Sequence, residues 1–241
     1  MKKPTDRQFN PDNKKFELGI YNYCDRWCER CPDTAKCFLY AKEQTTKKKH
    51  LERGENPNDL DIMMKDIIES FRETHELLEA QMKKMEIIKQ DLAESPEPEE
   101  EPDFDKHPLV KKGRRYFELT HKFLNEFTFE RQRMIMQFGI EISIDDISEE
   151  IKIISWYHSL LPSKCWRLLY DLYEIERETD WELKKIQLND LPKIYNLIDK
   201  CVKESKGALL SFSKKRPETA SVKKLAGLLE EIKEEVDKLK K

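Results

Sequence analysis

Glycine is scarce in this 241-residue chain, and long apolar runs are absent. Only six glycines are present, whereas tight turns between strands draw heavily on glycine. Leu, Ile, Lys and Glu dominate instead, and charged residues make up 39% of the chain. This composition is typical of long amphipathic helices. The sequence therefore predicts an all-α protein, arranged as an up-and-down helical bundle.

The amino terminus also lacks an apolar stretch. Residues 1–8 are Met-Lys-Lys-Pro-Thr-Asp-Arg-Gln, whereas a secretory signal would continue into a hydrophobic segment. We therefore expect a cytoplasmic protein that does not associate with membranes. In that reducing compartment, clustered cysteines more often hold a metal than pair in disulfides.

Basic charge is not in excess, which argues against a nucleic-acid-binding protein. The net charge is −3, the sequence pI is near 6.1, and no nucleic-acid recognition motif is present. The charge is uneven, because residues 1–53 carry 13 Lys and Arg against 8 Asp and Glu, whereas residues 54–109 carry 6 against 17. Arg26, Trp27 and Arg30, with the basic run at 47–50, could follow a phosphate backbone. A solvated basic face explains them more simply.

Four cysteines within fourteen residues are the most informative feature of the sequence. Cys24, Cys28, Cys31 and Cys37 are separated by three, two and five residues. Thiols at this density are typical of one metal site. An iron–sulfur cluster of the 4Fe–4S type is the expected cofactor, because runs of closely set cysteines ligate such clusters. Zinc is the second candidate, and a reduced thiol cluster without metal is the remaining alternative.

The preference for an iron–sulfur cluster over zinc depends on whether residues 20–31 form a helix. If residues 20–31 are helical, the first three cysteines fall at i, i+4 and i+7 on one face. Pro32 would then end the helix, so that Cys37 can return over the site. Zinc requires sulfurs roughly 4 Å apart, which is tight along one helical face.

Two other features of the cysteines carry less weight. The C-x3-C-x2-C spacing of the first three matches radical S-adenosylmethionine enzymes, but those enzymes need alternating strands and helices that this sequence lacks. Cys165 and Cys201 lie outside the cluster in helical patterns, where we expect small buried side chains.

Apolar residues recur every three or four positions along most of the remaining chain. This pattern predicts helices over residues 60–92 and 109–138, from Asp146 onward, and over about 189–212. Asp146 with Glu149 resembles a capping box at the start of the third helix. Pro162 should kink or interrupt that helix.

The chain divides into three predicted regions. They are a cysteine-rich segment at 1–53, a bundle at 54–213 with an acidic, proline-rich connector at 94–108, and a C-terminal amphipathic helix at 214–241. The apolar residues of the last region have heptad spacing; they are Val222, Leu225, Leu229, Ile232, Val236 and Leu239. This helix would pack on its own bundle, form a coiled coil that gives a homo-oligomer, or bind a partner helix.

A second candidate metal site lies inside the predicted bundle. Glu118-Leu-Thr-His121 has the Glu-x-x-His spacing of ferritin-like di-iron sites, and other histidines lie in apolar helical stripes. The candidate ligands are His75, Glu79, Glu118, His121 and His158. Di-iron sites use this spacing twice, and it occurs here once. Hydrogen-bonded core histidines are therefore the alternative interpretation.

Two stretches resemble an uncharacterised family of bacterial helical proteins with an N-terminal cysteine cluster. They are residues 21–32, Tyr-Asn-Tyr-Cys-Asp-Arg-Trp-Cys-Glu-Arg-Cys-Pro, and residues 154–167, Ile-Ser-Trp-Tyr-His-Ser-Leu-Leu-Pro-Ser-Lys-Cys-Trp-Arg. The resemblance implies a cytoplasmic bacterial protein and implies no reaction. The polar or amphipathic positions of interest in the second stretch are Trp156, His158, Lys164 and Arg167.

The sequence thus predicts a metal-binding protein of unspecified activity. Its four clustered cysteines would ligate an iron–sulfur cluster, or zinc, in a redox, sensing or structural role. The alternatives are a metalloenzyme with a histidine and glutamate site inside the bundle, and a nucleic-acid-binding protein that uses the basic cysteine-rich segment. The sequence does not decide whether the chain is an enzyme.

Overall fold

The computed structural model describes residues 15–17, 19–84, 102–138, 146–216 and 219–240. Every regular element in these ranges is helical, with no strand among them, so the all-α prediction is confirmed. The chain divides into two compact parts. The N-terminal unit comprises Met1–Asn22 and Arg26–Glu101, and the bundle unit comprises Tyr23–Asp25 and Pro102–Lys241.

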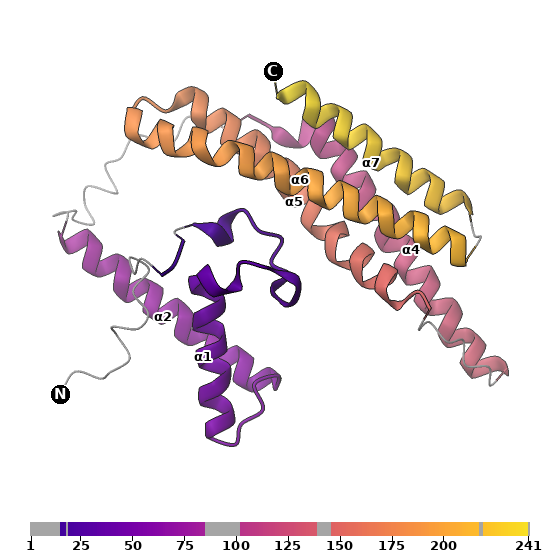
Figure 1. Cartoon of the computed structure of the whole chain (residues 1–241), viewed down its shortest axis with the longest axis horizontal. Coiled ribbons are helices and arrows are strands. Elements are labelled where there is room, and N and C mark those ends of the chain that lie inside the picture. The colour runs from indigo at the N-terminus through magenta and orange to yellow at the C-terminus, as the bar shows by residue number, and fades with distance from the viewer. Residues whose placement is uncertain (1–14, 18, 85–101, 139–145, 217–218, 241) are drawn as a thin grey trace. The chain divides into compact units, whose positions relative to one another are not determined.

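The bundle unit contains four long helices, shown in magenta to yellow in Figure 1. They are α4 (Pro108–Phe138), α5 (Ser148–Arg177), α6 (Trp181–Lys215) and α7 (Thr219–Leu239). Helices α4 and α6 each pack against both α5 and α7. Consecutive helices of this unit are antiparallel neighbours, as in an up-and-down bundle. The sequence predicted the bundle over residues 54–213, whereas this unit includes α7 and does not include α2.

The apolar core of the bundle unit is drawn from all four helices. Tyr116, Ile154, Ile198 and Leu229 are examples of fully buried side chains. Each buried Ile or Leu side chain contributes about 1.5–3 kcal/mol relative to its exposed state. This core makes the bundle a rigid support for residues that pack on it.

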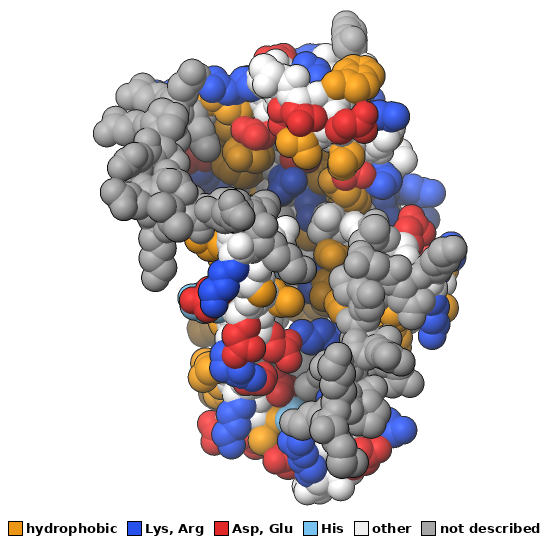
Figure 2. All heavy atoms as spheres, turned by 90° about the vertical axis from the view of Figure 1, so that its left-hand side faces the viewer, with side chains coloured by type: hydrophobic (Ala, Val, Ile, Leu, Met, Phe, Trp, Pro, Cys, Tyr) orange, Lys and Arg blue, Asp and Glu red, His pale blue; other side chains and the backbone are white. Residues whose placement is uncertain are grey.

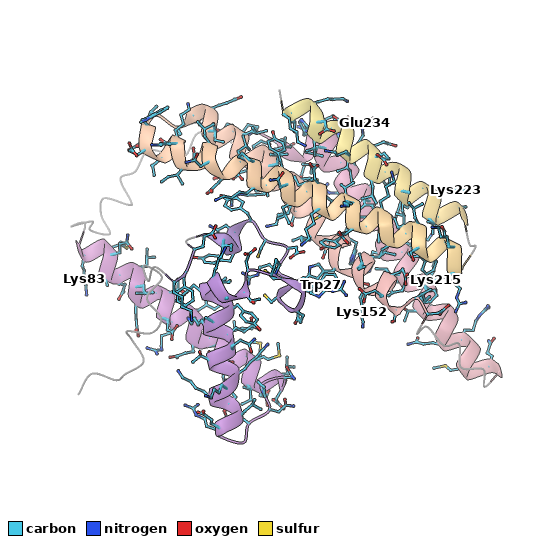
Figure 3. The ribbon with its side chains drawn as sticks, in the orientation of Figure 1. Trp27, Lys83, Lys152, Lys215, Lys223 and Glu234 are labelled. Atoms are coloured by element: carbon cyan, nitrogen blue, oxygen red, sulfur yellow. The ribbon has the colours of Figure 1, made fainter. Side chains whose placement is uncertain are left out.

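Helix α7 buries five of its six heptad residues in the same core, and the sixth, Leu239, is half-buried. Val222, Leu225, Leu229, Ile232 and Val236 are at most 3% exposed, so the apolar stripe packs on the bundle of its own chain. The side chains of Lys223 and Glu234, labelled in Figure 3, are exposed. A homo-oligomer through this helix stays a prediction.

Helix α5 differs from its prediction at two places. It runs without interruption from Ser148 to Arg177 with Pro162 inside it, although an interior proline costs about 3 kcal/mol. The burial of Leu161 and Cys165 on either side offsets that cost. The predicted capping box is also absent, since the residue at the N-cap is Ile147 and no side chain caps the helix there.

Glu150 joins the start of α5 to α6 through hydrogen bonds. Its Oε1 accepts hydrogen bonds from Ser211 Oγ and from Lys215 Nζ, each at 2.6 Å. Lys215 is labelled near the end of α6 in Figure 3. Burial opposes ionisation of Glu150, but these two donors prevail and lower its pKa. These bonds hold the first turn of α5 against the last turns of α6.

Helix α6 begins earlier than predicted. Its first residue is Trp181, and the Asp180 side chain caps it by accepting hydrogen bonds from two backbone N–H groups. The prediction started the helix near residue 189 because Pro192 was placed in its first turn. Pro192 lies in the interior of the helix instead.

The connector predicted at 94–108 is described only from residue 102. Here a 3₁₀ turn, Phe104–Lys106, precedes α4. The Phe104 ring makes edge-on contacts with Trp166, Tyr170 and Tyr173 of α5, with ring centroids 5.8–6.4 Å apart. The prolines and dense negative charge of this run predict a solvated connector. That prediction is wrong for this end of the connector, which is packed on the bundle.

The N-terminal unit contains two helices, α1 (Phe38–Glu52) and α2 (Leu60–Lys84). Helix α1 was not predicted, because it has no apolar stripe. The predicted continuation of α2 to residue 92 lies outside the described residues. Polar contacts join the two helices: His50 Nε2 lies 3.0 Å from Asp66 Oδ1, and Lys42 Nζ lies 2.6 Å from Glu73 Oε2.

The described residues of the N-terminal unit include no buried apolar side chain. His50 is the only one of them that is buried. Along α2, large apolar side chains are exposed, with Phe71 at 72% and Leu77 at 71%. Hydrophobic burial therefore stabilises this unit far less than the bundle unit. No helix in the described ranges has the length and apolar character needed to cross a membrane.

Candidate metal centre

The cysteine-rich segment is not the helix considered for residues 20–31. It forms three short 3₁₀ turns, Ile20–Asn22, Cys28–Arg30 and Thr34–Lys36. Arg26 has a φ of 60°, which belongs to the left-handed region and ends any right-handed helix there. The first three cysteines therefore do not lie on one helical face. The geometric objection to zinc, which depended on that face, no longer applies.

Cys28 and Cys31 bracket one of these turns. Cys28 is its first residue, and the Cys31 backbone N–H donates to the Cys28 carbonyl oxygen at 3.2 Å. A 3₁₀ turn has three residues per turn, so residues three apart lie on the same side. C-x-x-C is also a spacing from which two thiolates can bind one zinc ion.

Cys37 occupies the N-cap of α1. Its Sγ accepts a hydrogen bond from the Tyr40 backbone N–H at 3.5 Å, in place of the oxygen that Ser or Asp usually supplies. The N-terminus of a helix favours negative charge.

All four clustered cysteines are partly exposed, and none of the six cysteines forms a disulfide. Their donor chemistry fits a tetrathiolate metal centre, since four sulfur ligands suit zinc or an iron–sulfur cluster and each thiol is partly exposed. Across the described residues, no three His, Cys, Asp or Glu side chains are grouped closely enough to hold a metal ion. Convergence of the four thiols stays a prediction from their spacing.

The two remaining cysteines are buried, as expected for packing residues. Cys165 and Cys201 are fully buried in α5 and α6. Burial raises the pKa of both thiols, to about 12 for Cys201. Both therefore stay protonated near neutral pH and are poor metal ligands.

Asp25, which follows Cys24, is a buried carboxylate of the bundle unit. It is 6% exposed. Its Oδ2 accepts a hydrogen bond from the Tyr157 hydroxyl at 2.7 Å and forms an ion pair with Lys200 Nζ at 2.7 Å. Its backbone carbonyl accepts a third bond from Trp156 Nε1 at 2.8 Å. Burial and the Asp25 carboxylate raise the pKa of Tyr157, so this phenol is a donor at all physiological pH values.

These contacts join the two stretches on which the family resemblance rests. Asp25 belongs to residues 21–32, and Trp156 and Tyr157 belong to residues 154–167. Trp156 was a candidate from the sequence, whereas Asp25, Tyr157 and Lys200 were not. No periodic or local signal connects positions more than 130 residues apart, so only the fold could reveal this cluster.

The second candidate site is brought together only in part. His121 of α4 and His158 of α5 lie side by side, with ring centroids 6.1 Å apart and planes inclined by 17°. Burial chiefly lowers the pKa of His158, and His121 lowers it further. Glu118 is exposed and lies 3.9 Å from Arg115 of its own helix.

The other two predicted ligands of that site lie in α2 of the N-terminal unit. His75 Nδ1 and Glu79 Oε1 are 3.9 Å apart, and both side chains are exposed. The apolar periodicity of α2 predicted that His75 lies on a buried stripe. That prediction is wrong, because its side chain is exposed. Neither it nor Glu79 belongs to the core of the bundle.

The basic residues of the cysteine-rich segment mostly have local acidic or aromatic neighbours. Arg30 stacks on the Trp27 ring with its guanidinium carbon 3.7 Å from the ring centroid. Lys47 lies 2.9 Å from Glu43, and Lys48 lies 3.8 Å from Glu52. Figure 2 shows acidic and basic side chains interspersed on the face it presents. These pairings favour the solvated basic face over a nucleic-acid interface.

None of three comparisons, with models of protein families, with curated proteins and with solved structures, finds a match to this chain.

Proposed function

We propose that this chain is a metal-binding protein in which Cys24, Cys28, Cys31 and Cys37 ligate one metal centre. The observation that carries the proposal is the run of four partly exposed thiols, in a segment with a C-x-x-C turn and a capping thiol. The centre is an iron–sulfur cluster or a zinc ion, since both take four thiolates. Arg26, Arg30 and Lys36 offset the negative charge of such a site.

The described residues of the N-terminal unit include no buried apolar side chain, which supports a structural role for this centre. A small unit without a hydrophobic core requires disulfides, a metal or another staple to stay folded. Disulfides are absent from the cysteines. Metal binding supplies folding free energy directly in units of this kind, so the centre would hold the segment that leads into α1.

The test is elemental analysis of full-length protein purified without oxygen. We expect iron and acid-labile sulfide in roughly equal amounts, or zinc alone. A Cys31→Ser variant should lose most of the metal, and a Cys165→Ala variant should keep it because Cys165 is buried in the bundle. Wild-type protein without stoichiometric metal would contradict the proposal.

A metalloenzyme site inside the bundle is the alternative that the sequence raised. Its support is limited to the adjacent imidazoles of His121 and His158. The two proposals differ in one measurement. Metal that survives Cys31→Ser but is lost in His121→Ala belongs to the bundle, and the reverse pattern belongs to the cysteines.

A further inference from the structure

Cys24 is flanked on both sides by residues that bond to the bundle helices. On one side, the Tyr23 hydroxyl donates to Asp190 Oδ2 of α6 at 2.7 Å. The Lys193 ammonium lies over the Tyr23 ring, 5.5 Å from its centroid, and also bonds Asp190 at 2.8 Å. On the other side is the buried Asp25.

Asp25 is held by three groups from two helices. Tyr157 and Trp156 come from α5, and Lys200 comes from α6. A buried carboxylate with a charged partner and a neutral donor is costly to leave incomplete, because the remaining charge would be buried without compensation. Tyr157 is only 2% exposed, so water cannot easily replace its hydroxyl. The backbone on either side of Cys24 is therefore fixed to α5 and α6.

The backbone next to this anchor carries strain. Arg26 is the only residue other than glycine with a positive φ in the described part of the chain. Such a conformation persists only where the surroundings enforce it. The three bonds to Asp25 are immediately adjacent and can supply that enforcement.

We propose that Asp25, Trp156, Tyr157 and Lys200 form an anchor that positions Cys24 as a metal ligand. These are positioning residues and do not themselves bind the metal. The inference rests on the proposed four-cysteine centre. Groups that orient a ligand commonly alter metal affinity when they are removed, because the ligand must then be ordered at the moment of binding.

The variant that tests the anchor is Tyr157→Phe, which removes one hydroxyl and keeps the buried ring. The matched control is Tyr195→Phe. Tyr195 is also a buried tyrosine of the bundle unit, and its hydroxyl donates to the Leu239 carbonyl at 2.9 Å. The control thus loses an equivalent hydrogen bond that has no part in holding Asp25.

Cobalt(II) titration of the reduced, metal-free, full-length protein measures the effect. We expect Tyr157→Phe to weaken cobalt binding by about 10- to 100-fold, and to reduce the sulfur-to-cobalt charge-transfer absorbance, which scales with the number of bound thiolates. Tyr195→Phe should match wild type in both. Lys200→Met should behave like Tyr157→Phe, and Lys200→Arg should restore binding because it keeps the charge beside Asp25.

A second measurement does not require metal. In the metal-free protein, alkylation of Cys24 should be faster in Tyr157→Phe than in wild type, and unchanged in Tyr195→Phe. Wild-type protein that binds neither cobalt nor iron overturns the proposed function, and the inference with it. Tight wild-type binding that Tyr157→Phe leaves unchanged, in affinity and in absorbance, overturns the anchor alone.

Discussion

The contacts of His50 predict that the packing of α1 on α2 depends on pH. It is 8% exposed, with Nδ1 2.6 Å from Glu55 Oε2 and Nε2 3.0 Å from Asp66 Oδ1. Hydrogen bonds to Glu55 first and to Asp66 second raise the pKa of His50. The same contact with His50 lowers the pKa of Glu55. The imidazolium therefore links α1 to the following loop and to α2.

We expect the contact between α1 and α2 to weaken as the pH rises above neutrality. A raised histidine pKa gives stabilisation that is complete below about pH 6.5, the ordinary histidine pKa, and is lost as the pH rises through the folded-state pKa. The lowered pKa of Glu55 gives stabilisation that is lost only in acid. Amide exchange of α1 measured between pH 5 and 9, corrected for the intrinsic pH dependence, reports the change.

The control for this prediction is the exposed histidine of α2. His50→Gln should abolish the pH dependence of α1 protection, and His75→Gln should leave it as in wild type. Protection that increases with pH would contradict the assignment of His50 as the charged link.

At the scale of the element, the sequence predicted the bundle helices well where apolar periodicity was unbroken. Helix α7 and the first two-thirds of α4 follow from their stripes alone. Helix α1 could not be predicted, because only His50 is buried along it and polar contacts hold it instead.

The cysteine-rich segment also differs from its prediction, since a positive φ at Arg26 depends on tertiary contacts. The buried hydroxyls of Tyr116, Thr120 and Ser205 likewise lay on helix faces that the pattern of apolar residues did not mark.

Pro162 shows why a local rule failed within α5. Opposite it on α4 lies Gly113, where an added Cβ would be 3.3 Å from Pro162 Cα and 3.5 Å from Pro162 Cβ. The two helices therefore approach closely at this point, and their packing keeps α5 continuous despite the missing N–H. The sequence contains both residues but not their pairing.

The close approach predicts opposite effects of one substitution at two glycines. Gly207→Ala in α6 meets no atom within 4 Å, so it should raise the free energy of unfolding by about 0.5–1 kcal/mol. Gly113→Ala should forfeit that gain and lower the free energy of unfolding by about 1–3 kcal/mol, because the Pro162 backbone must move. Urea denaturation of both variants measures the difference. Equal stabilisation by the two alanines would show that α4 and α5 are not in tight contact there.

At the scale of the whole molecule, the two units differ in what stabilises them. The bundle unit has a continuous apolar core from four helices, whereas the described N-terminal unit has none. Its helices α1 and α2 depend on a few polar contacts, most of them partly exposed, and exposed ion pairs contribute little. The proposed metal centre would therefore be a large additional source of stability for this unit.

Removal of metal should consequently unfold one unit and spare the other. After treatment with a chelator, or in Cys31→Ser, we expect amide protection to fall throughout α1 and α2 while α4 to α7 keep theirs. Cys24 is the one proposed ligand in the bundle unit, and it lies outside the apolar core of the four helices. Hydrogen exchange followed by mass spectrometry resolves the two sets of helices, and thermal unfolding by circular dichroism should retain the bundle transition. Re-addition of the metal should restore protection in wild type but not in Cys31→Ser. A bundle that melts together with metal loss, or N-terminal helices that are indifferent to it, would contradict a structural role for the cysteine centre.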